Sequence, residues 1–456
     1  MNLLAAKKLL VLVCSLLIAA FIAVPFVSLG QNPVAAMPGE MLVQFKANAT
    51  AAEKSRAFGK VNATQKSVLV SKNKRADGGG DLVQVTYQAN LSSLQARRAL
   101  AADGVVEFAE PNWLYTPDAV SNDPYYTNGS QWGMCGALTS PANPYGTAAA
   151  TAWALGVTGS NTVYVGMIDD GIQYNHPDLD GQVWVNPYDP IDGVDNDGNG
   201  YADDVRGWDF ANNDSSIYDG GRRGALDVHG THVAGIIGAK GGNGTGVAGV
   251  SWNIKLISTK FIGPLGGDTA NAVRALDYLI DLKQRHGLNI VAANASWGGG
   301  DYSQALSDAI GRAAAANILF VASAGNGGAD YVADNNDAAP HYPSSYPHAN
   351  IISVTGIDAA GAKYVSGNYG ATSVDIAAPA VNLISPVPYG KYGSYSGTSG
   401  ATPFVTGAVA LYASVHPGAS YLQIKNAILT GAVPTASMAG KCVSGGRLHI
   451  PTALLF

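Results

Sequence analysis

The sequence predicts an α/β fold, in which a parallel β-sheet is sandwiched by helices and is preceded by a small α+β domain of βαββαβ order. Two patterns indicate this. From Tyr125 onward, near-continuous apolar runs of strand length alternate with helical segments, as is typical of strands covered on both faces. Before that point the segments are shorter and strand-like runs outnumber helices. Of the 456 residues, 47% are apolar and 13% are charged, so the chain can bury a large core and is not disordered.

The N-terminal segment has the layout of a secretory signal. Lys7 and Lys8 precede an apolar run from Leu9 to Val27, and small residues around Ala36 provide a cleavage site. We expect residues 1–36 to be removed on secretion, which leaves no stable membrane association. An uncleaved anchor is the alternative, because the run is near the ~20 residues that cross a bilayer.

Residues 37–118 form the predicted small domain. Its βαββαβ order is typical of a split-βαβ sandwich. A stretch rich in Pro, Asp and Asn, from Thr116 to Pro124, is the predicted linker. The expected elements are a strand at 41–46, a helix at 49–60, strands at 67–71 and 81–87, a helix capped by Asn90 that runs to about Ala102, and a strand at 105–109 that Glu110-Pro111-Asn112 ends.

Residues 119–456 form the larger predicted domain. Sites in such sheets lie beyond the carboxyl ends of the strands, so chemistry is expected just after each apolar run. The expected strands are 163–168, 254–262, 289–295 and 318–322, and the expected helices are 230–240, 268–286, 303–316, 398–415 and 420–429.

Charge and cysteine content exclude two classes of protein. The net charge is -6 and no basic stretch is present, so nucleic acid is not an expected partner. Three cysteines are too few for a disulfide framework and lack the paired spacing of a zinc site. In an exported chain Cys135 and Cys442 either form one bridge or stay as two buried thiols.

Three segments carry residues suited to nucleophilic catalysis. Asp169 ends an apolar run, His229 opens a helix in His-Gly-Thr-His, and Ser399 begins another helix in Gly-Thr-Ser-Gly. A serine hydroxyl is a weak nucleophile and needs a base such as imidazole, and a buried carboxylate fixes the tautomer of that base. Spacing alone does not choose between His229 and His232 as the base.

These segments, in this order, resemble the Asp, His and Ser boxes of the subtilisin-like serine peptidases, the subtilases. The resemblance runs from about Asn122 to Phe456 and implies endopeptidase activity. It implies Asp169 as the orienting carboxylate, His229 as the base and Ser399 as the nucleophile. The segment Ala324-Gly325-Asn326 resembles the oxyanion-hole box of the family, so the amide of Asn326 is the expected oxyanion donor.

A further segment resembles the strand edge on which subtilases align a substrate peptide. Ser296 and Gly298 are expected to flank the pocket for the side chain before the cut bond, and Trp297 to face a pocket farther along the substrate. Core packing is the alternative for Trp297. Two residues depart from the family pattern. Asp170 stands where Ser or Thr is usual, and Gly400 replaces the usual Met.

The residues between the Asp and His boxes predict a calcium site. Carboxylates this close repel one another unless water or a hard cation offsets them. A solvated acidic loop is the alternative, and the resemblance implies a weaker second site at Asp178 and Asn243. The spacing resembles the start of an EF-hand loop and gives as expected ligands Asp195, Asp197, Asn199, Tyr201 and Asp203.

Together these observations predict a secreted, monomeric, calcium-stabilised serine endopeptidase that cleaves polypeptide substrates. The small domain resembles the subtilase propeptide, which implies an intramolecular inhibitor with its tail near Leu114 to Ser121. A catalytically silent protein of the same fold, used for binding, is the alternative.

Overall fold

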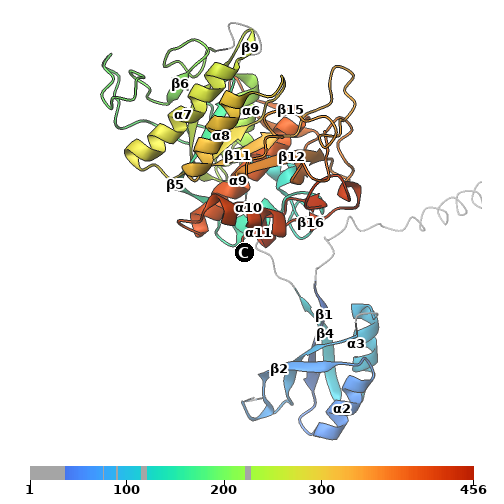
Figure 1. Ribbon diagram of the computed structural model, residues 1–456. Coiled ribbons are helices and arrows are strands. Elements are labelled where there is room, and N and C mark those ends of the chain that lie inside the picture. Colours follow the sequence, from blue (N-terminus) through green and yellow to red (C-terminus); the bar gives the residue numbers. More distant parts are fainter. Residues whose placement is uncertain (1–35, 75–76, 89–90, 114–120, 221–226) are drawn as a thin grey trace, which may run out of the picture. The chain divides into compact units, whose positions relative to one another are not determined.

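The computed structural model describes residues 36–74, 77–88, 91–113, 121–220 and 227–456. The chain divides into two compact units, Met1–Tyr115 and Thr116–Phe456, which are described separately (Figure 1). The predicted signal falls almost wholly outside the described residues. In the part of the chain that is described, no helix is long and apolar enough to cross a membrane.

The first unit has the predicted βαββαβ order. Its four strands form an antiparallel sheet of order β2-β3-β1-β4. Met41, Val43 and Phe45 on the central strand β1 are fully buried together with Leu100 of α3. The elements are β1 (Ala36–Phe45), α2 (Ala51–Gly59), β2 (Thr64–Val70), η1 (Lys72–Lys74), β3 (Leu82–Thr86), α3 (Ser93–Ala101) and β4 (Val106–Trp113).

Two boundary predictions in this unit were wrong. Ser92 caps α3, because its hydroxyl accepts from Gln95 N and the Gln95 side chain accepts from Ser92 N, whereas Asn90 lies outside the described residues. Pro111 does not end the last strand, since β4 continues to Trp113. β4 is an edge strand, where a missing N–H costs no ladder hydrogen bond.

The second unit is built on a nine-stranded sheet. All pairs from β6 to β13 are parallel, as predicted, and only β16 is antiparallel to its neighbour. In spatial order the strands are β16 (Val433–Pro434), β17 (Gly446–Arg447), β13 (Ile376–Pro379), β12 (Ile351–Ile357), β11 (Leu319–Ser323), β10 (Ile290–Ala295), β5 (Gly159–Asp169), β7 (Asn253–Lys260) and β6 (Gly207–Asp209).

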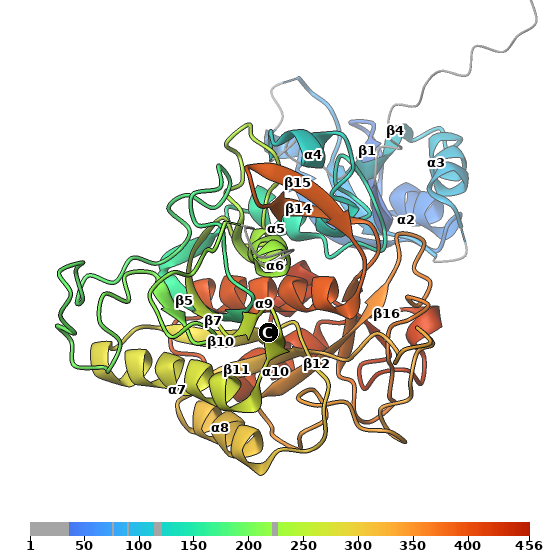
Figure 2. The ribbon, with the colours of Figure 1, turned by 90° about the horizontal axis from the view of Figure 1, so that it is seen from above.

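Helices cover both faces of this sheet (Figure 2). On one face, α6 (Val228–Gly238), α9 (Thr398–Val415) and α10 (Tyr421–Thr430) share a core with Val165 and Met167 of β5. On the other, α7 (Thr269–His286) and α8 (Gln304–Ala315) share a core with Ile168. Side chains of a strand alternate between faces, so one strand supplies both cores.

The remaining elements are short. Outside the sheet lie two hairpins, the longer of which packs against α6. They are α4 (Pro124–Thr127), η2 (Trp132–Met134), α5 (Ala149–Ala154), β8 (Ile262–Gly263), β9 (Gly266–Gly267), β14 (Leu383–Val387), β15 (Lys391–Tyr395), η3 (Ala436–Met438) and α11 (Ile450–Ala453).

The two cysteines of this unit are free thiols, so the bridge is not formed. Cys135 belongs to the core beneath α9, whereas Cys442 packs in a separate small cluster with Met438. Each sulfur lies near a backbone carbonyl, and burial raises the pKa of Cys135 to about 11, which keeps the thiol protonated.

Candidate active site

The site begins at the carboxyl end of β5, where the direction of strand order reverses. From β5 the chain forms β6 and β7 on one side of that strand and then β10 and β11 on the other. A crevice forms at such a switch point. Asp169, the last residue of β5, therefore stands where the fold places ligands.

Asp169 holds the imidazole of His229. Asp169 is 1% exposed, and its Oδ1 lies 2.7 Å from Nδ1 of His229, the second residue of α6. The same oxygen accepts the Asp170 N–H at 2.8 Å. Because Nδ1–H of the imidazole donates to the carboxylate, the other ring nitrogen, Nε2, keeps its lone pair and can take up a proton.

A second buried carboxylate, that of Asp170, lies at the start of the same helix. It accepts the Gly230 N–H at 2.6 Å and the His229 N–H at 3.3 Å. Burial, and next the charge of Asp169, raise the pKa of Asp170 to about 7. Burial lowers the pKa of His229. The negative charges of Asp169, mainly, and of Asp170 raise it by more than burial lowers it, so the net change in pKa is upward.

Ser399 reaches the same place from the opposite end of the sequence. It is the second residue of α9, a largely buried helix that packs against β5, β10 and β11. Ser399 and His229 together line a cavity of about 230 Å³. A Cβ added at Gly397 would lie 3.2 Å from Ser399 Oγ, so glycine leaves the hydroxyl accessible.

The Asn326 side chain is oriented by α9, the helix that carries Ser399. Oδ1 of Asn326 accepts from Thr398 N at 2.8 Å and lies 3.0 Å from Thr398 Oγ1. Nδ2 and Oδ1 both lie 3.6 Å from the same added Cβ of Gly397 that would meet the Ser399 hydroxyl. Because Thr398 occupies Oδ1, the N–H₂ group is the part of the amide left to donate near Ser399.

The predicted substrate strand follows β10. Ser296 Oγ donates to the Ser399 carbonyl at 2.8 Å and accepts from Asn294, so this side chain ties the strand to α9, and its place beside a substrate pocket stays a prediction. Trp297 donates to the Ile168 carbonyl at 2.8 Å and packs on Phe261. With Gly298 it lines a cavity of about 530 Å³, so Trp297 is both a packing and a lining residue.

The second histidine of the box has a packing role. His232 is 4% exposed, its Nε2 lies 2.9 Å from the Leu383 carbonyl, and its ring packs on Tyr395. Burial lowers the pKa of His232 to about 4. The structure therefore pairs Asp169 with His229.

Comparison with known proteins agrees with this geometry. The subtilase family model matches residues 160–447. The chain belongs to the subtilase family. It is 33% identical over 392 residues to a thermophilic serine proteinase of Bacillus sp. (strain AK1), covering 86% of this chain and 81% of that protein. It is 32% identical over 310 residues to thermitase of Thermoactinomyces vulgaris, covering 68% and 89%.

A solved structure agrees as well. It is one of the proteases from Pseudoalteromonas arctica, and the match covers 74% of this chain and 99% of that chain, with a TM-score of 0.57 at 25% identity. The protein is therefore a subtilase, and it is a serine endopeptidase.

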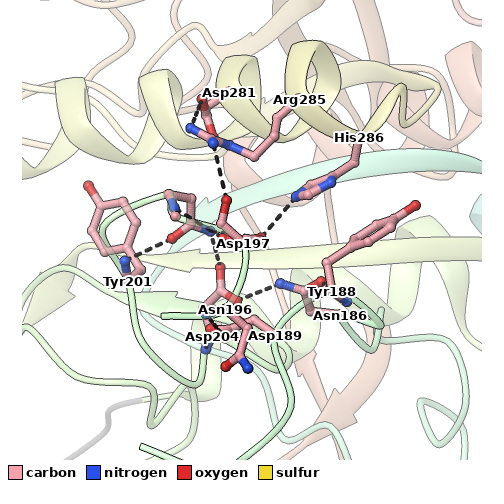
Figure 3. Close-up of polar contacts among 12 residues, drawn as sticks. Asn186, Tyr188, Asp189, Asn196, Asp197, Tyr201, Asp204, Asp281, Arg285 and His286 are labelled. Atoms are coloured by element: carbon pink, nitrogen blue, oxygen red, sulfur yellow. Dashed lines mark hydrogen bonds and ion pairs between the residues drawn. The ribbon is translucent and has the colours of Figure 1, made fainter. Parts of the chain in front are cut away.

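The carboxylates of the acidic loop accept hydrogen bonds from N–H groups of the protein (Figure 3). Asp195 accepts three backbone N–H groups of residues 198–200. Asp197 Oδ2 lies 2.9 Å from Nε2 of His286, whose ring stacks on Tyr188. Among the described residues, no group of three or more His, Cys, Asp or Glu is placed to hold a metal ion. The carboxylate and amide oxygens of the loop are of the kind that a hard cation binds, and calcium at this loop stays a prediction.

The other predicted ligands of this loop are also hydrogen-bonded. Asp203 Oδ1 accepts the N–H groups of Asp192 and Gly193 at 2.8 and 2.9 Å. Asn199 accepts the Tyr201 N–H through Oδ1 and turns its amide nitrogen toward Asp204, 2.8 Å away.

The weaker second site does not fit a cation in this arrangement. Asp178 is fully buried, and its Oδ1 accepts from the Asn243 amide nitrogen at 3.1 Å. Its Oδ2 accepts from Val247 N and from the Tyr392 hydroxyl, each at 2.9 Å. Both oxygens thus face donors, and Asn243 presents N–H where a metal would need an oxygen ligand.

A buried ion cluster at the start of α6 was not predicted from the sequence. Lys260, at the end of β7, is fully buried and its Nζ lies 2.8 Å from Asp227, 2.6 Å from Asp219 and 3.7 Å from Asp209. Asp227 is the residue before α6 begins. The sequence signal was weak, because the same run also contains Lys255, Ser258 and Thr259. The cluster fixes the start of the helix that carries the imidazole.

Removing the cation of this cluster should destabilise the protein. In Lys260→Met, uncompensated carboxylates remain in the core, so the free energy of unfolding should fall by about 3–5 kcal/mol. Denaturant unfolding measures the loss. Lys255→Met, on the same strand but with its Nζ on the Gly181 carbonyl near the surface, is the control. Equal stability of the two variants would contradict the role of the cluster.

Proposed function

We propose that this subtilase hydrolyses peptide bonds through Asp169, His229 and Ser399, with Asn326 as oxyanion donor. The observation that carries the proposal is the 2.7 Å contact between Asp169 and His229, beside a cavity that His229 shares with Ser399. That contact fixes the tautomer in which Nε2 is free to act as a base.

The reaction proceeds in two stages. Ser399 Oγ attacks the carbonyl carbon of the scissile bond as His229 Nε2 takes its proton, and the Asn326 N–H₂ group donates to the developing oxyanion. His229 then returns the proton to the leaving amine, the C–N bond breaks and an acyl-enzyme remains. Water attacks the ester with His229 again as base, and Ser399 is regenerated with release of the acid.

Substrate polypeptides are proposed to align along the strand edge at 296–298. An extended peptide adds a strand through main-chain hydrogen bonds, and pockets then select side chains. The 530 Å³ cavity beside Trp297 and Gly298 provides such a pocket.

The first unit is proposed to be a propeptide, in a precursor that is secreted and then cleaves itself. Its support is the βαββαβ order and the position before the peptidase domain. The expected tail, near Leu114 to Ser121, and the boundary at 118 lie mostly outside the described residues. The mature enzyme is proposed to act as a monomer after loss of residues 1–36 and 37–118.

Hydrolysis of denatured casein by the processed chain tests this function. Release of peptides, abolished by covalent fluorophosphonate treatment, is expected. The rival function, binding without catalysis, predicts no peptide release although the chain is folded and processed by an added protease.

The carboxyl of Asp170 should set the pH range of the enzyme. Its charge raises the pKa of His229, which must be neutral to act as a base. Asp170→Asn removes that charge, so the acid limb of the kcat/KM profile should move to lower pH, by on the order of one pH unit. Asp180→Asn, a change at an exposed carboxylate, should leave the profile in place. A shift to higher pH in Asp170→Asn would contradict the assignment.

Calcium at the acidic loop can be tested by chelation. A cation bound only by the folded state raises stability, so EDTA should lower Tm and added calcium should restore it. The same melt on Asp195→Asn, which removes one ligand charge, should respond less to EDTA. An unchanged Tm of the parent protein in EDTA would show that the loop is stabilised by its hydrogen bonds and not by calcium.

A further inference from the structure

The helix that carries Ser399 contains a proline in its second turn. Pro403 lies four residues after Ser399 in α9, and at that position of a regular helix the backbone N–H would donate to the Ser399 carbonyl. Proline has no N–H, and its ring also crowds the carbonyl four residues before it. The Ser399 carbonyl therefore cannot be paired along α9 in the usual way, and it is open to a donor from outside the helix.

That donor is a side chain at the end of a central strand of the sheet. Ser296 is the first residue after β10, and its Oγ donates to the Ser399 carbonyl at 2.8 Å. Ser296 is 3% exposed, so bulk water has little access to the bond. A hydroxyl has one hydrogen, and this bond uses it. Ser296 thus takes the place of the N–H that Pro403 lacks and attaches the peptide group of Ser399 to the sheet.

Two further side chains hold the Ser296 hydroxyl in this orientation. Asn294 Nδ2 donates to Ser296 Oγ at 3.0 Å. Thr406 Oγ1 lies 2.7 Å from Asn294 Oδ1 and 3.3 Å from the Thr402 carbonyl, so its hydrogen points mainly to the amide oxygen. Asn294 and Thr406 are fully buried. Because the Asn294 oxygen accepts from Thr406, its nitrogen faces Ser296, and the Ser296 hydrogen is directed to the Ser399 carbonyl.

This chain of hydrogen bonds acts on the reacting hydroxyl through the backbone of Ser399. The direction of the carbonyl fixes the peptide group after Ser399, and with it the direction in which the side chain leaves the helix. β10 pairs with β5, the strand that ends in Asp169. The chain therefore refers the Ser399 hydroxyl and the His229 imidazole to two neighbouring strands of one sheet. A misplacement of about 1 Å in such a site can cost about 10²-fold in rate.

We propose that Ser296, Asn294 and Thr406 are positioning residues for the nucleophile of this subtilase. Together they hold the peptide group of Ser399 in place of the hydrogen bond that Pro403 cannot make. The inference rests on the proposed function, in which Ser399 Oγ is the reacting atom. The chain acts on the rate of attack by Ser399 and not on the affinity for substrate.

Ser296→Ala tests this role in the processed enzyme. It should lower kcat for a tetrapeptide anilide about tenfold and leave KM within about twofold, because the donor is lost while the backbone of the strand edge stays. The rate constant for inactivation by diisopropyl fluorophosphate should fall by a similar factor, since this small reagent reports on Ser399 without an aligned peptide. Thr406→Val keeps the shape of the side chain but removes the first donor, and should lower both rates about threefold.

Ser251→Ala is the matched control. Ser251 is fully buried, and its Oγ donates to the Gly407 carbonyl at 3.3 Å. This variant therefore also removes a hydroxyl that donates to a carbonyl of α9, but one farther from Ser399. Both rates should stay within about twofold of the parent values, because the peptide group of Ser399 keeps its donor. Denaturant unfolding of all variants measures how much stability each lost bond contributes.

The outcomes separate this proposal from the proposed function. Parent rates in Ser296→Ala, or an equal loss in Ser251→Ala, would overturn the positioning role while the proposed function stands. A higher KM with unchanged inactivation would also overturn it, because Ser296 would then act on the substrate. Parent rates in Thr406→Val would overturn the chain beyond Ser296. A parent enzyme that is processed by an immobilised protease, yet neither cleaves the anilide nor reacts with the fluorophosphate, would overturn the proposed function itself.

Discussion

Replacing Ser399 with alanine should lower kcat at least about 10⁴-fold, because the acyl-enzyme can no longer form. The precursor should also stay uncleaved near residue 118, since the proposed processing is self-catalysed. Casein hydrolysis measures the first effect, and N-terminal sequencing of the secreted chain measures the second.

Ser396→Ala is the matched control for this variant. Ser396 lines the same 230 Å³ cavity but is not part of the proposed triad, so this variant should process and remain active. A Ser399→Ala chain that is processed at the same position, with no added protease, would refute self-cleavage.

Replacing Asp169 with asparagine should lower kcat about 10⁴-fold while the fold stays intact. The carboxylate accepts Nδ1–H of His229 at 2.7 Å, whereas the amide can donate to Nδ1 and so place the proton on Nε2. His229 would then have no lone pair toward Ser399. KM should change little, because Asp169 is buried and does not face the substrate.

The neighbouring carboxylate provides the comparison. Asp170→Asn alters the charge beside His229 but not the tautomer of the ring, so its loss of kcat near the pH optimum should be small. A similar loss in both variants would show that charge near the imidazole, and not its orientation by Asp169, controls the reaction.

The sequence predicted the parts of this enzyme that are encoded locally. Runs such as 163–168 and 318–322 were buried strands of a parallel sheet because hydrophobic residues without alternation indicate cover on both faces. Asp169 and His229 could be proposed as site residues because each lies at an element boundary, where the polar residue stands out against an apolar segment. The family pattern then supplied the choice of His229 over His232.

Features that depend on tertiary contacts could not be predicted in this way. β13 is only four residues long, and its neighbours in the sheet specify it more than its own pattern does. The bond from Ser296 to a carbonyl 103 positions away in the sequence was not predicted. Lys260 pairs with three carboxylates that are 33 to 51 positions away in the sequence. His341 likewise contacts Gly298 only in the folded chain.

The proposed triad is tested most directly by mapping the site at which a fluorophosphonate modifies the processed enzyme. We expect mass spectrometry to show stoichiometric labelling of the peptide that contains Ser399, and loss of that labelling in His229→Ala. Modification at another serine, or equal labelling of Ser399 when His229 is absent, would contradict it.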